Sequence, residues 1–284
     1  MEHSNEQTLK LAMAGDIHAF QKLYAEFQNH LKSYLYRLLA DRNDADDLAH
    51  DTFIRAFDKI STFKGKSSFK TWVFQIATIL AYDHLRQYKR WTVNTKELAK
   101  GIVMANATVR NHILKVGNES PEGTFEMRDH IDHCFTCMGK TLAIEKQVAL
   151  ILKDVYDFSV KEIALIIDKS QDVVKHLLQD ARHTLMDVFD HRCALISKKG
   201  VCNQCSELNG MFNPKQNQQE ALNHLDLVKG SKKFNREELF DLRLRLIKTI
   251  DPLRGKGADL QDLLMKCDRM AMGELPVPAD NAQN

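Results

Sequence analysis

The apolar residues of this chain recur at intervals of three and four over most of its length, and this spacing is what most constrains the fold. The clearest stripe lies near the N-terminus, at Phe20, Leu23, Tyr24, Phe27, Leu31, Tyr34, Leu35 and Leu38. One face of an α-helix has this period, whereas a half-buried strand alternates at every second residue. The sequence has no proline before Pro121 and no period-two run with turn dipeptides. It therefore predicts an all-α fold.

The helices are expected to form two domains, a linker and an extension. With 284 residues, of which 44% are hydrophobic, the chain is long enough for about two domains. Residues 92–128 are polar and irregular, which predicts a linker. The predicted parts are a first domain over 1–91, the linker over 92–128, a second domain over 129–196 and a small helical extension over 197–284.

Opposite charges are concentrated in two neighbouring segments of the first domain. Residues 41–58 hold six aspartates and two arginines, whereas residues 61–91 hold six lysines or arginines and one aspartate. The basic segment contains a Gly/Ser/Lys loop, FKGKSS, followed by an aromatic and apolar helix from Phe69. This pattern predicts two binding faces for different partners. Two solvated helix faces are the alternative.

The second domain contains two predicted helices joined by a short turn. VKEIALII over 160–167 has an amphipathic helical period, DKSQ over 168–171 is a turn, and DVVKHLLQDARHTLMDVF over 172–189 is a longer helix. Entry into the second helix through Ser170 is typical of a helix-turn-helix. An ordinary packed helix pair has the same pattern.

Taken together, these segments resemble a known family. In chain order, GDIHAFQKLYAEF, DADDLAHDTFIRAF, FKGKSSFKTWVFQIATILAYDHLRQYKR and EKQVALILKDVYDFSVKEIALIIDKSQDVVKHLLQDAR resemble the sigma factors of bacterial RNA polymerase, in particular the extracytoplasmic-function (ECF) group. The resemblance covers a little over half of the chain. It implies a sigma region 2 over about residues 15–91 and a region 4 over about 130–190.

The resemblance implies a non-catalytic subunit that directs the polymerase core to promoters and helps to open the −10 element. Its acidic helix would dock on the clamp coiled coil of the polymerase through Asp44, Asp46, Asp47, Asp51 and Phe53. The single-stranded −10 element would be captured by Lys64, Lys66, Ser67, Lys70, Trp72, Arg86, Lys89 and Arg90. The −35 element would be read by Ser170, Gln171, Lys175, His176 and Arg182. For Trp72, a core position is the alternative, since it lies at helical spacing with other apolar residues.

The sequence departs from the family pattern at three places. Thr78 and Ile79 stand where members commonly carry an Arg-Asn pair, and Asp168 stands in the turn where glycine is usual. In the recognition helix, Leu177 and Asp180 match two family arginines. A helix with so few bases is expected to bind the −35 element weakly.

Two Cys-x-x-Cys pairs flank the predicted helix-turn-helix: Cys134 with Cys137, and Cys202 with Cys205. Four thiolates can hold a tetrahedral zinc ion, so these cysteines are candidate zinc ligands, although more than sixty residues separate the pairs. A redox switch and free thiols are the alternatives.

The remaining features bear on location and on function class. The N-terminus does not resemble a signal peptide, and no apolar run approaches the ~20 residues of a membrane span, so a cytoplasmic protein is expected. The resemblance implies that the extension is regulatory, with an anti-sigma or signal-sensing protein as a further partner. A metal- or redox-sensing interaction protein that keeps the sigma fold is the alternative function. An enzyme is not expected, because no nucleophile-base pair or phosphate-binding glycine loop occurs at a workable spacing.

Overall fold

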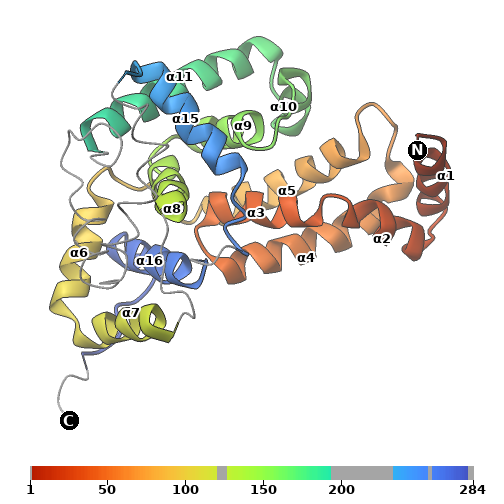
Figure 1. The fold of residues 1–284 in the computed structure, drawn as a ribbon. Helices are drawn as coiled ribbons and strands as arrows, with labels where there is room; N and C mark the ends of the chain where they lie inside the picture. Colours follow the sequence, from red (N-terminus) through yellow and green to blue (C-terminus); the bar gives the residue numbers. More distant parts are fainter. Residues whose placement is uncertain (1, 120–126, 193–232, 255–257, 281–284) are drawn as a thin grey trace. The chain divides into compact units, whose positions relative to one another are not determined.

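The computed structural model describes residues 2–119, 127–192, 233–254 and 258–280 (Figure 1). The described residues form α-helices and a short 3-10 helix and contain no strand, so the all-α prediction is confirmed. The chain divides into two compact units: unit 1 comprises residues 1–87 and 144–178, and unit 2 comprises residues 88–143 and 179–284. Each unit joins segments that are distant in the sequence. The domain boundaries predicted from the sequence remain predictions.

None of the helices in the described part of the chain combines the length and the apolar character that a membrane crossing requires.

Unit 1 is a bundle built around the predicted apolar stripe. Its helices are α1 (Glu2–Met13), α2 (Ile17–Ala25), α3 (Gln28–Leu39), α4 (Arg42–Lys59), the 3-10 helix η1 (Ile60–Thr62), α5 (Phe69–Leu85), α9 (Ile144–Asp154), α10 (Val160–Ile166) and the start of α11 (Gln171–Arg192). Every residue of the stripe from Phe20 to Leu38 is buried. Burying one such side chain contributes about 1.5–3 kcal/mol, so this face determines how α2 and α3 pack.

Side chains at the helix starts define the boundaries of the bundle. The Asp41 carboxylate accepts a hydrogen bond from the Asp44 backbone N–H at 3.0 Å and caps α4. The Ser68 hydroxyl accepts one from the Thr71 backbone N–H at 3.0 Å and caps α5. Such caps satisfy backbone donors that have no partner within the helix.

Helices α9 and α10 pack in the same unit as α3 and α5. Gln147 of α9 donates a hydrogen bond to the carbonyl of Arg37 at 3.1 Å, and the Arg37 guanidinium donates one to the Tyr156 hydroxyl at 2.7 Å. The rings of Phe74 and Phe158 lie 4.9 Å apart. Part of the predicted region 4 therefore shares a core with the predicted region 2.

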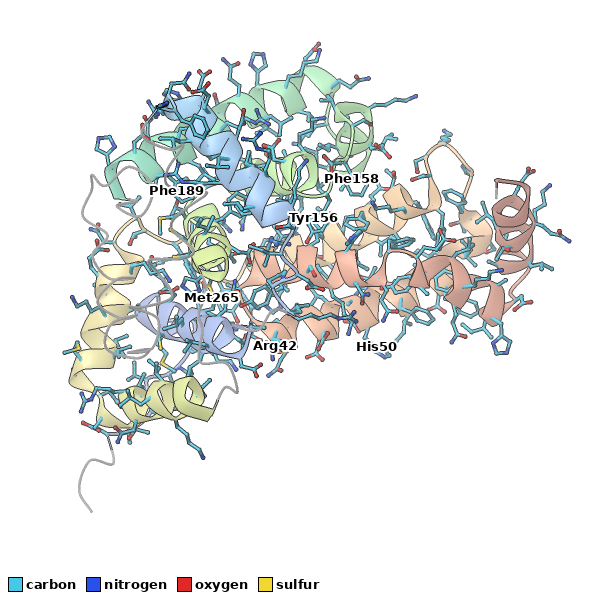
Figure 2. All side chains as sticks on the ribbon, viewed as in Figure 1. Arg42, His50, Tyr156, Phe158, Phe189 and Met265 are labelled. Carbon is cyan, nitrogen blue, oxygen red and sulfur yellow. The ribbon has the colours of Figure 1, made fainter. Side chains whose placement is uncertain are left out.

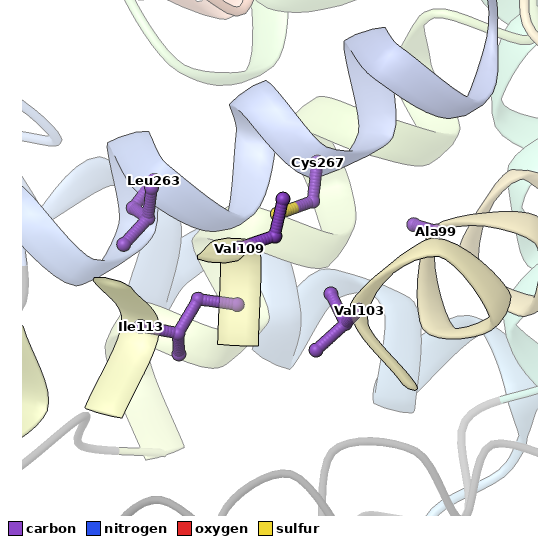
Figure 3. Close-up of a cluster of buried hydrophobic side chains, with 6 residues drawn as sticks. All are labelled: Ala99, Val103, Val109, Ile113, Leu263 and Cys267. Atoms are coloured by element: carbon purple, nitrogen blue, oxygen red, sulfur yellow. The ribbon is translucent and has the colours of Figure 1, made fainter. Parts of the chain in front are cut away.

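Unit 2 contains α6 (Thr95–Ala105), α7 (Ala107–Glu119), α8 (Met127–Gly139), the rest of α11, α15 (Arg236–Lys248) and α16 (Ala258–Ala271). The prediction of an irregular stretch is wrong for residues 95–119, which form α6 and α7. Their apolar residues pack with α16 in one buried cluster, shown in Figure 3: Ala99, Val103, Val109, Ile113, Leu263 and Cys267. The short apolar faces of α6 and α7 are easily overlooked because their partner helix lies about 150 residues further along the chain.

Two groups of buried charges connect α16 and the residues after it to the rest of unit 2. In the first, the Asp268 carboxylate contacts Lys96 of α6 and lies 3.4 Å from His133 of α8. Burial raises the pKa of Asp268, but Lys96 and His133 outweigh it and hold the pKa below its usual value. In the second, the Glu274 carboxylate lies 3.4 Å from Lys140 and 3.1 Å from Arg269. The extension is thus part of the core of this unit.

Candidate polymerase and nucleic-acid interfaces

Helix α4 has a buried inner face and an acidic outer face. Its inner residues are Ala45, Ala49, Thr52 and Ala56. Asp47, Asp51, Ile54 and Asp58 are exposed and follow one another at intervals of three or four residues, so they share one side of the helix. An acidic stripe with an exposed isoleucine at its centre is suited to a basic partner that also offers apolar surface.

The other predicted docking residues have partners within unit 1. Asp46 forms an ion pair with Lys32 at 2.7 Å, and the Asp44 carboxylate lies 3.4 Å from the ring of His84. Phe53 is half-buried, and its ring meets that of Phe20 edge-on at 5.1 Å. Among the five predicted residues, Asp47 and Asp51 are therefore the ones best placed for an external partner.

The predicted capture loop stands immediately before α5. Lys64, Gly65 and Lys66 are exposed, and Gly65 has a φ of +67°, a left-handed conformation that glycine adopts without strain. Beneath the loop, the ring of Phe63 lies 5.3 Å from that of Trp72. Trp72 is half-buried, so part of its ring contributes to the core and part is accessible. Its role as a stacking platform for a base remains a prediction.

The side of α5 that follows this loop is covered by α10 and the turn before it. The Lys70 ammonium lies 4.7 Å from the centre of the Phe158 ring, and burial lowers the pKa of Lys70. The Thr71 hydroxyl donates a hydrogen bond to the Glu162 carboxylate at 3.0 Å. Gln75 donates one to the carbonyl of Leu165 at 2.9 Å.

Three of these contact residues, Thr71, Gln75 and Glu162, were not identified from the sequence. Glu162 lies three residues after Ser159, and the two form a capping box at the start of α10. The Ser-x-x-Glu spacing could have identified the cap. No local pattern predicts the contact of Glu162 with α5.

The basic residues after α5 have different environments. Arg86 is exposed and forms an ion pair with Asp83 at 2.8 Å, and Lys89 is exposed. Arg90 instead donates hydrogen bonds to the carbonyls of Leu142 at 2.6 Å and Gly139 at 3.3 Å. Burial lowers the pKa of Arg90 to about 10. These bonds favour a structural role for Arg90 at the end of α8, whereas Arg86 and Lys89 remain placed for phosphates.

The predicted helix-turn-helix is present as α10, a turn and α11. Asp168 in the turn has a φ of +53°, which is a left-handed backbone conformation. Glycine adopts this conformation without strain and aspartate tolerates it, so aspartate can stand here in place of the usual glycine. The Ser170 hydroxyl accepts a hydrogen bond from the Val173 backbone N–H at 3.3 Å. Gln171, Lys175 and His176 are exposed on the first turns of α11. The geometry therefore leaves these three side chains accessible to a duplex.

Later in α11, the extension contacts acidic residues of the predicted recognition helix. Arg236 of α15 pairs with Asp187 and lies 2.8 Å from Asp190. The Arg243 guanidinium stacks on the ring of Phe189 at 5.0 Å. Arg182 is half-buried. Part of the acidity that disfavours DNA on α11 is thus neutralised by α15.

Comparison with known proteins agrees with this arrangement. The Sigma-70 region 2 family matches residues 23–92, which include α4, the loop and α5. The RNA polymerase sigma-H factor of Pseudomonas aeruginosa is 27% identical over 184 residues, which are 65% of this chain and 93% of that protein. The ECF RNA polymerase sigma factor SigW of Bacillus subtilis is 26% identical over 189 residues, 65% of this chain and 96% of that protein. These matches support a sigma-factor role for this chain.

Among solved structures, a chain in the co-crystal structure of the sigma factor RpoE with the anti-sigma factor NepR from Bartonella quintana is similar to this chain. The TM-score is 0.42 at 19% identity, and the match covers 60% of this chain and 96% of that one.

The four cysteines of the two Cys-x-x-Cys pairs are candidate zinc ligands by sequence. Cys134 and Cys137 lie on α8, while Cys202 and Cys205 lie outside the described residues. In the part of the chain that the structure describes, no three His, Cys, Asp or Glu side chains are grouped so that they could hold a metal ion. Cys137 is fully buried, and burial raises the pKa of its thiol well above the usual value. A thiol in this state is a poor metal ligand, because metals bind the thiolate.

We expect the three cysteines of known environment to differ in reactivity. Cys134 is partly exposed, whereas Cys137 and Cys267 are buried, and burial raises the pKa of Cys267 to about 12. At pH 8, iodoacetamide should therefore modify Cys134 at least about 10-fold faster than Cys137 or Cys267. Peptide mass spectrometry after timed quenching measures the three rates, with urea-unfolded protein as the control. Equal rates in the folded protein would contradict the burial of α8.

Proposed function

We propose that this sigma factor brings core RNA polymerase to a subset of promoters and helps to melt their −10 elements, acting in the cytoplasm and without a cofactor. The observation that supports it most directly lies in the matched region 2. There, the exposed loop with Lys64 and Lys66 stands directly before α5 and above an aromatic cluster. Cations that bind phosphates and aromatic rings that bind bases are the two features a single-strand site requires.

The outer face of α4 is the proposed site for the polymerase. Asp47, Asp51 and Asp58 surround the exposed Ile54, and the buried alanines on the opposite side hold the helix in the bundle. Opposite charges accelerate and orient association, while an apolar residue at the centre adds affinity. The clamp coiled coil, which is basic in the polymerases of this family, is the proposed partner.

Helix α11 is the proposed reader of the −35 element, through Gln171, Lys175 and His176. Lys175 forms an ion pair with Asp172 at 2.9 Å, so its charge is shared with an acid. We therefore expect a weak −35 contact, with most of the promoter affinity coming from region 2. The extension, through α15 and α16, is proposed to be regulatory, and an anti-sigma protein is proposed as a further partner.

Run-off transcription with core polymerase on a library of genomic fragments tests the proposal. A product that depends on this protein and starts at defined promoters supports it. Core binding without any product would instead support an interaction protein that has kept the sigma fold.

Replacing Asp47 and Asp51 by asparagine should weaken binding to core polymerase by roughly 10-fold at low salt, and the loss should shrink at high salt. The reason is that both side chains are exposed on the face proposed for docking. Fluorescence anisotropy of the labelled protein titrated with core enzyme measures the affinity. The matched control replaces Glu237 and Asp241, two exposed acids of α15, by their amides. Equal effects of both variants would show that α4 has no special role.

A further inference from the structure

One side of α5 carries an apolar row that is open to solvent. Five residues follow one another there at intervals of four and three, so they share one face of the helix: Trp72, Ile76, Ile79, Asp83 and Arg86. Trp72 and Ile76 are half-buried, whereas Ile79 is 50% exposed. Asp83 and Arg86 are exposed and form an ion pair at 2.8 Å. This side, called here the Ile79 face, thus presents three apolar side chains followed by charged ones.

Buried contacts on another side of α5 fix its rotation. Thr78 is fully buried, and its hydroxyl donates a hydrogen bond to the carbonyl of Phe74 at 2.7 Å and lies 2.7 Å from the Tyr34 hydroxyl. The Phe74 ring lies 4.9 Å from that of Phe158, which Figure 2 labels. Because Thr78 faces the core, its neighbour Ile79 faces solvent. Of the two helix positions that depart from the family pattern, one therefore serves the core and the other the surface.

Cations stand at both ends of the Ile79 face. Lys64 and Lys66 are exposed in the loop before α5, and the Phe63 ring beneath this loop lies 5.3 Å from that of Trp72. Arg86 stands about 21 Å from Trp72 along the helix, at ~1.5 Å per residue. That is the length of about six stacked nucleotides at ~3.4 Å each. A single strand whose phosphates contact both ends therefore crosses this face.

The side chain of Ile79 can distinguish between nucleobases. An isoleucine neither donates nor accepts a hydrogen bond, so a polar base edge that packs against it loses the hydrogen bonds that water supplied. Thymine differs from the other bases because its edge carries a C5 methyl group, which apolar side chains contact favourably. An asparagine at the same position would instead bond the polar edge of adenine. Isoleucine at position 79 therefore changes which base this helix favours.

We propose that Ile79 is a specificity residue, which favours a thymine in the captured strand by contact with its C5 methyl group. The inference rests on the proposed capture of the −10 strand by the loop and α5. The loop lysines contact phosphates, so the affinity that they supply does not depend on sequence. Ile79 adds a preference at one base position, and Ile76 and Trp72 complete the apolar surface beside it.

The first test measures base preference without assuming a promoter. Holoenzyme formed from core polymerase and this protein selects 12-nucleotide single strands from a randomised pool, and the bound strands are sequenced. We expect wild type to enrich thymine at one position, and Ile79→Asn to lose this enrichment while it keeps the preferences at other positions. Ile79→Val, which keeps an apolar side chain, should retain the enrichment. If no thymine position depends on Ile79, the proposal is overturned.

The second test removes the methyl group alone. In a fluorescein-labelled copy of the selected strand, deoxyuridine replaces the thymidine, which deletes the C5 methyl group and leaves the hydrogen-bonding groups unchanged. Wild-type holoenzyme should bind the deoxyuridine probe about 4-fold more weakly, the loss that corresponds to one buried methyl group. In Ile79→Ala the difference between the two probes should shrink to less than about 2-fold. Equal binding of both probes by wild type overturns the proposal.

Leu11 of α1 supplies the matched control. It is 49% exposed and belongs to the same unit, so Leu11→Asn places an equal polar group on another part of the surface. This variant should select and discriminate as wild type does, and urea unfolding of each variant checks that the fold is intact. The affinity of Ile79→Asn for core polymerase is measured in parallel. A loss of core binding in this variant would show that the face contacts the polymerase instead of DNA, and it overturns the proposal.

A lysine variant separates the proposal from the function on which it rests. If Lys64→Ala with Lys66→Ala weakens strand binding while Ile79→Asn keeps the base preference of wild type, capture by the loop stands and the role of Ile79 is wrong. If the lysine variant binds the selected strand and melts promoters normally, the capture role is wrong, and the specificity role of Ile79 is overturned with it.

Discussion

A variant with Lys64, Lys66 and Lys70 replaced by alanine should bind core polymerase normally and form open complexes roughly 10- to 100-fold less efficiently. Two of these lysines are exposed on the loop before α5, and the third is half-buried against Phe158. Each phosphate contact to a single strand contributes about 0.7 to the slope of log affinity against log salt, so three lost contacts should lower the slope by about 2. Fluorescence of 2-aminopurine placed in the −10 element follows melting.

The control for this variant removes three lysines elsewhere. Lys10, Lys22 and Lys115 are exposed and lie outside the loop and α5. Their replacement by alanine changes the net charge equally and should leave open-complex formation within about 2-fold of wild type. Normal melting by the Lys64, Lys66 and Lys70 variant would show that the loop is not the capture element.

Replacing Glu274 by glutamine should lower the free energy of unfolding by about 3–5 kcal/mol, because it leaves buried cations without a counter-ion. The Glu274 side chain is 3% exposed and contacts Lys140 and Arg269, which are themselves 2% and 4% exposed. Its other oxygen accepts a hydrogen bond of 2.5 Å from Trp91. Burial lowers the pKa of Lys140 to about 8, although Glu274 opposes the shift. Urea unfolding followed by tryptophan fluorescence measures the loss.

Two further variants define the origin of that loss. Glu237→Gln, at an exposed position of α15, should change the stability by less than about 0.5 kcal/mol. Combining Glu274→Gln with Lys140→Met should recover part of the loss, because one unpaired charge is then removed. An unchanged unfolding curve for Glu274→Gln would mean that the residues after α16 are not part of the core of unit 2.

Local patterns in the sequence predicted the helical fold, while the roles of the candidate site residues remain predictions. The stripe from Phe20 to Leu38 is buried as its spacing indicates, and the helix-turn-helix begins its second helix at Gln171, just after Ser170. The acidic face of α4 and the exposed loop lysines follow from residue type and spacing alone. These features are readable because a helix repeats every 3.6 residues and its caps lie within one turn of its ends.

The helices of the predicted linker show where local patterns are insufficient. Val103 and Ile113 lie in the segment that was predicted to be a linker, and both are buried in a cluster with Leu263 and Cys267 of α16. Arg90 was assigned to DNA on charge, but its guanidinium binds the carbonyls of Gly139 and Leu142, about fifty residues away.

The sequence by itself therefore determined which faces of this protein are apolar, acidic or basic, and where its helices begin. The tertiary structure decided which faces meet: Glu162 on Thr71, 91 residues away, and Asp268 on Lys96, 172 residues away. The sequence pattern does not predict these pairings, because periodicity and charge describe one helix at a time. Many helices have apolar faces that could pack against the same partner. The choice of partner depends on packing, on the desolvation of each charge and on the chain connections taken together, and these are properties of the whole fold.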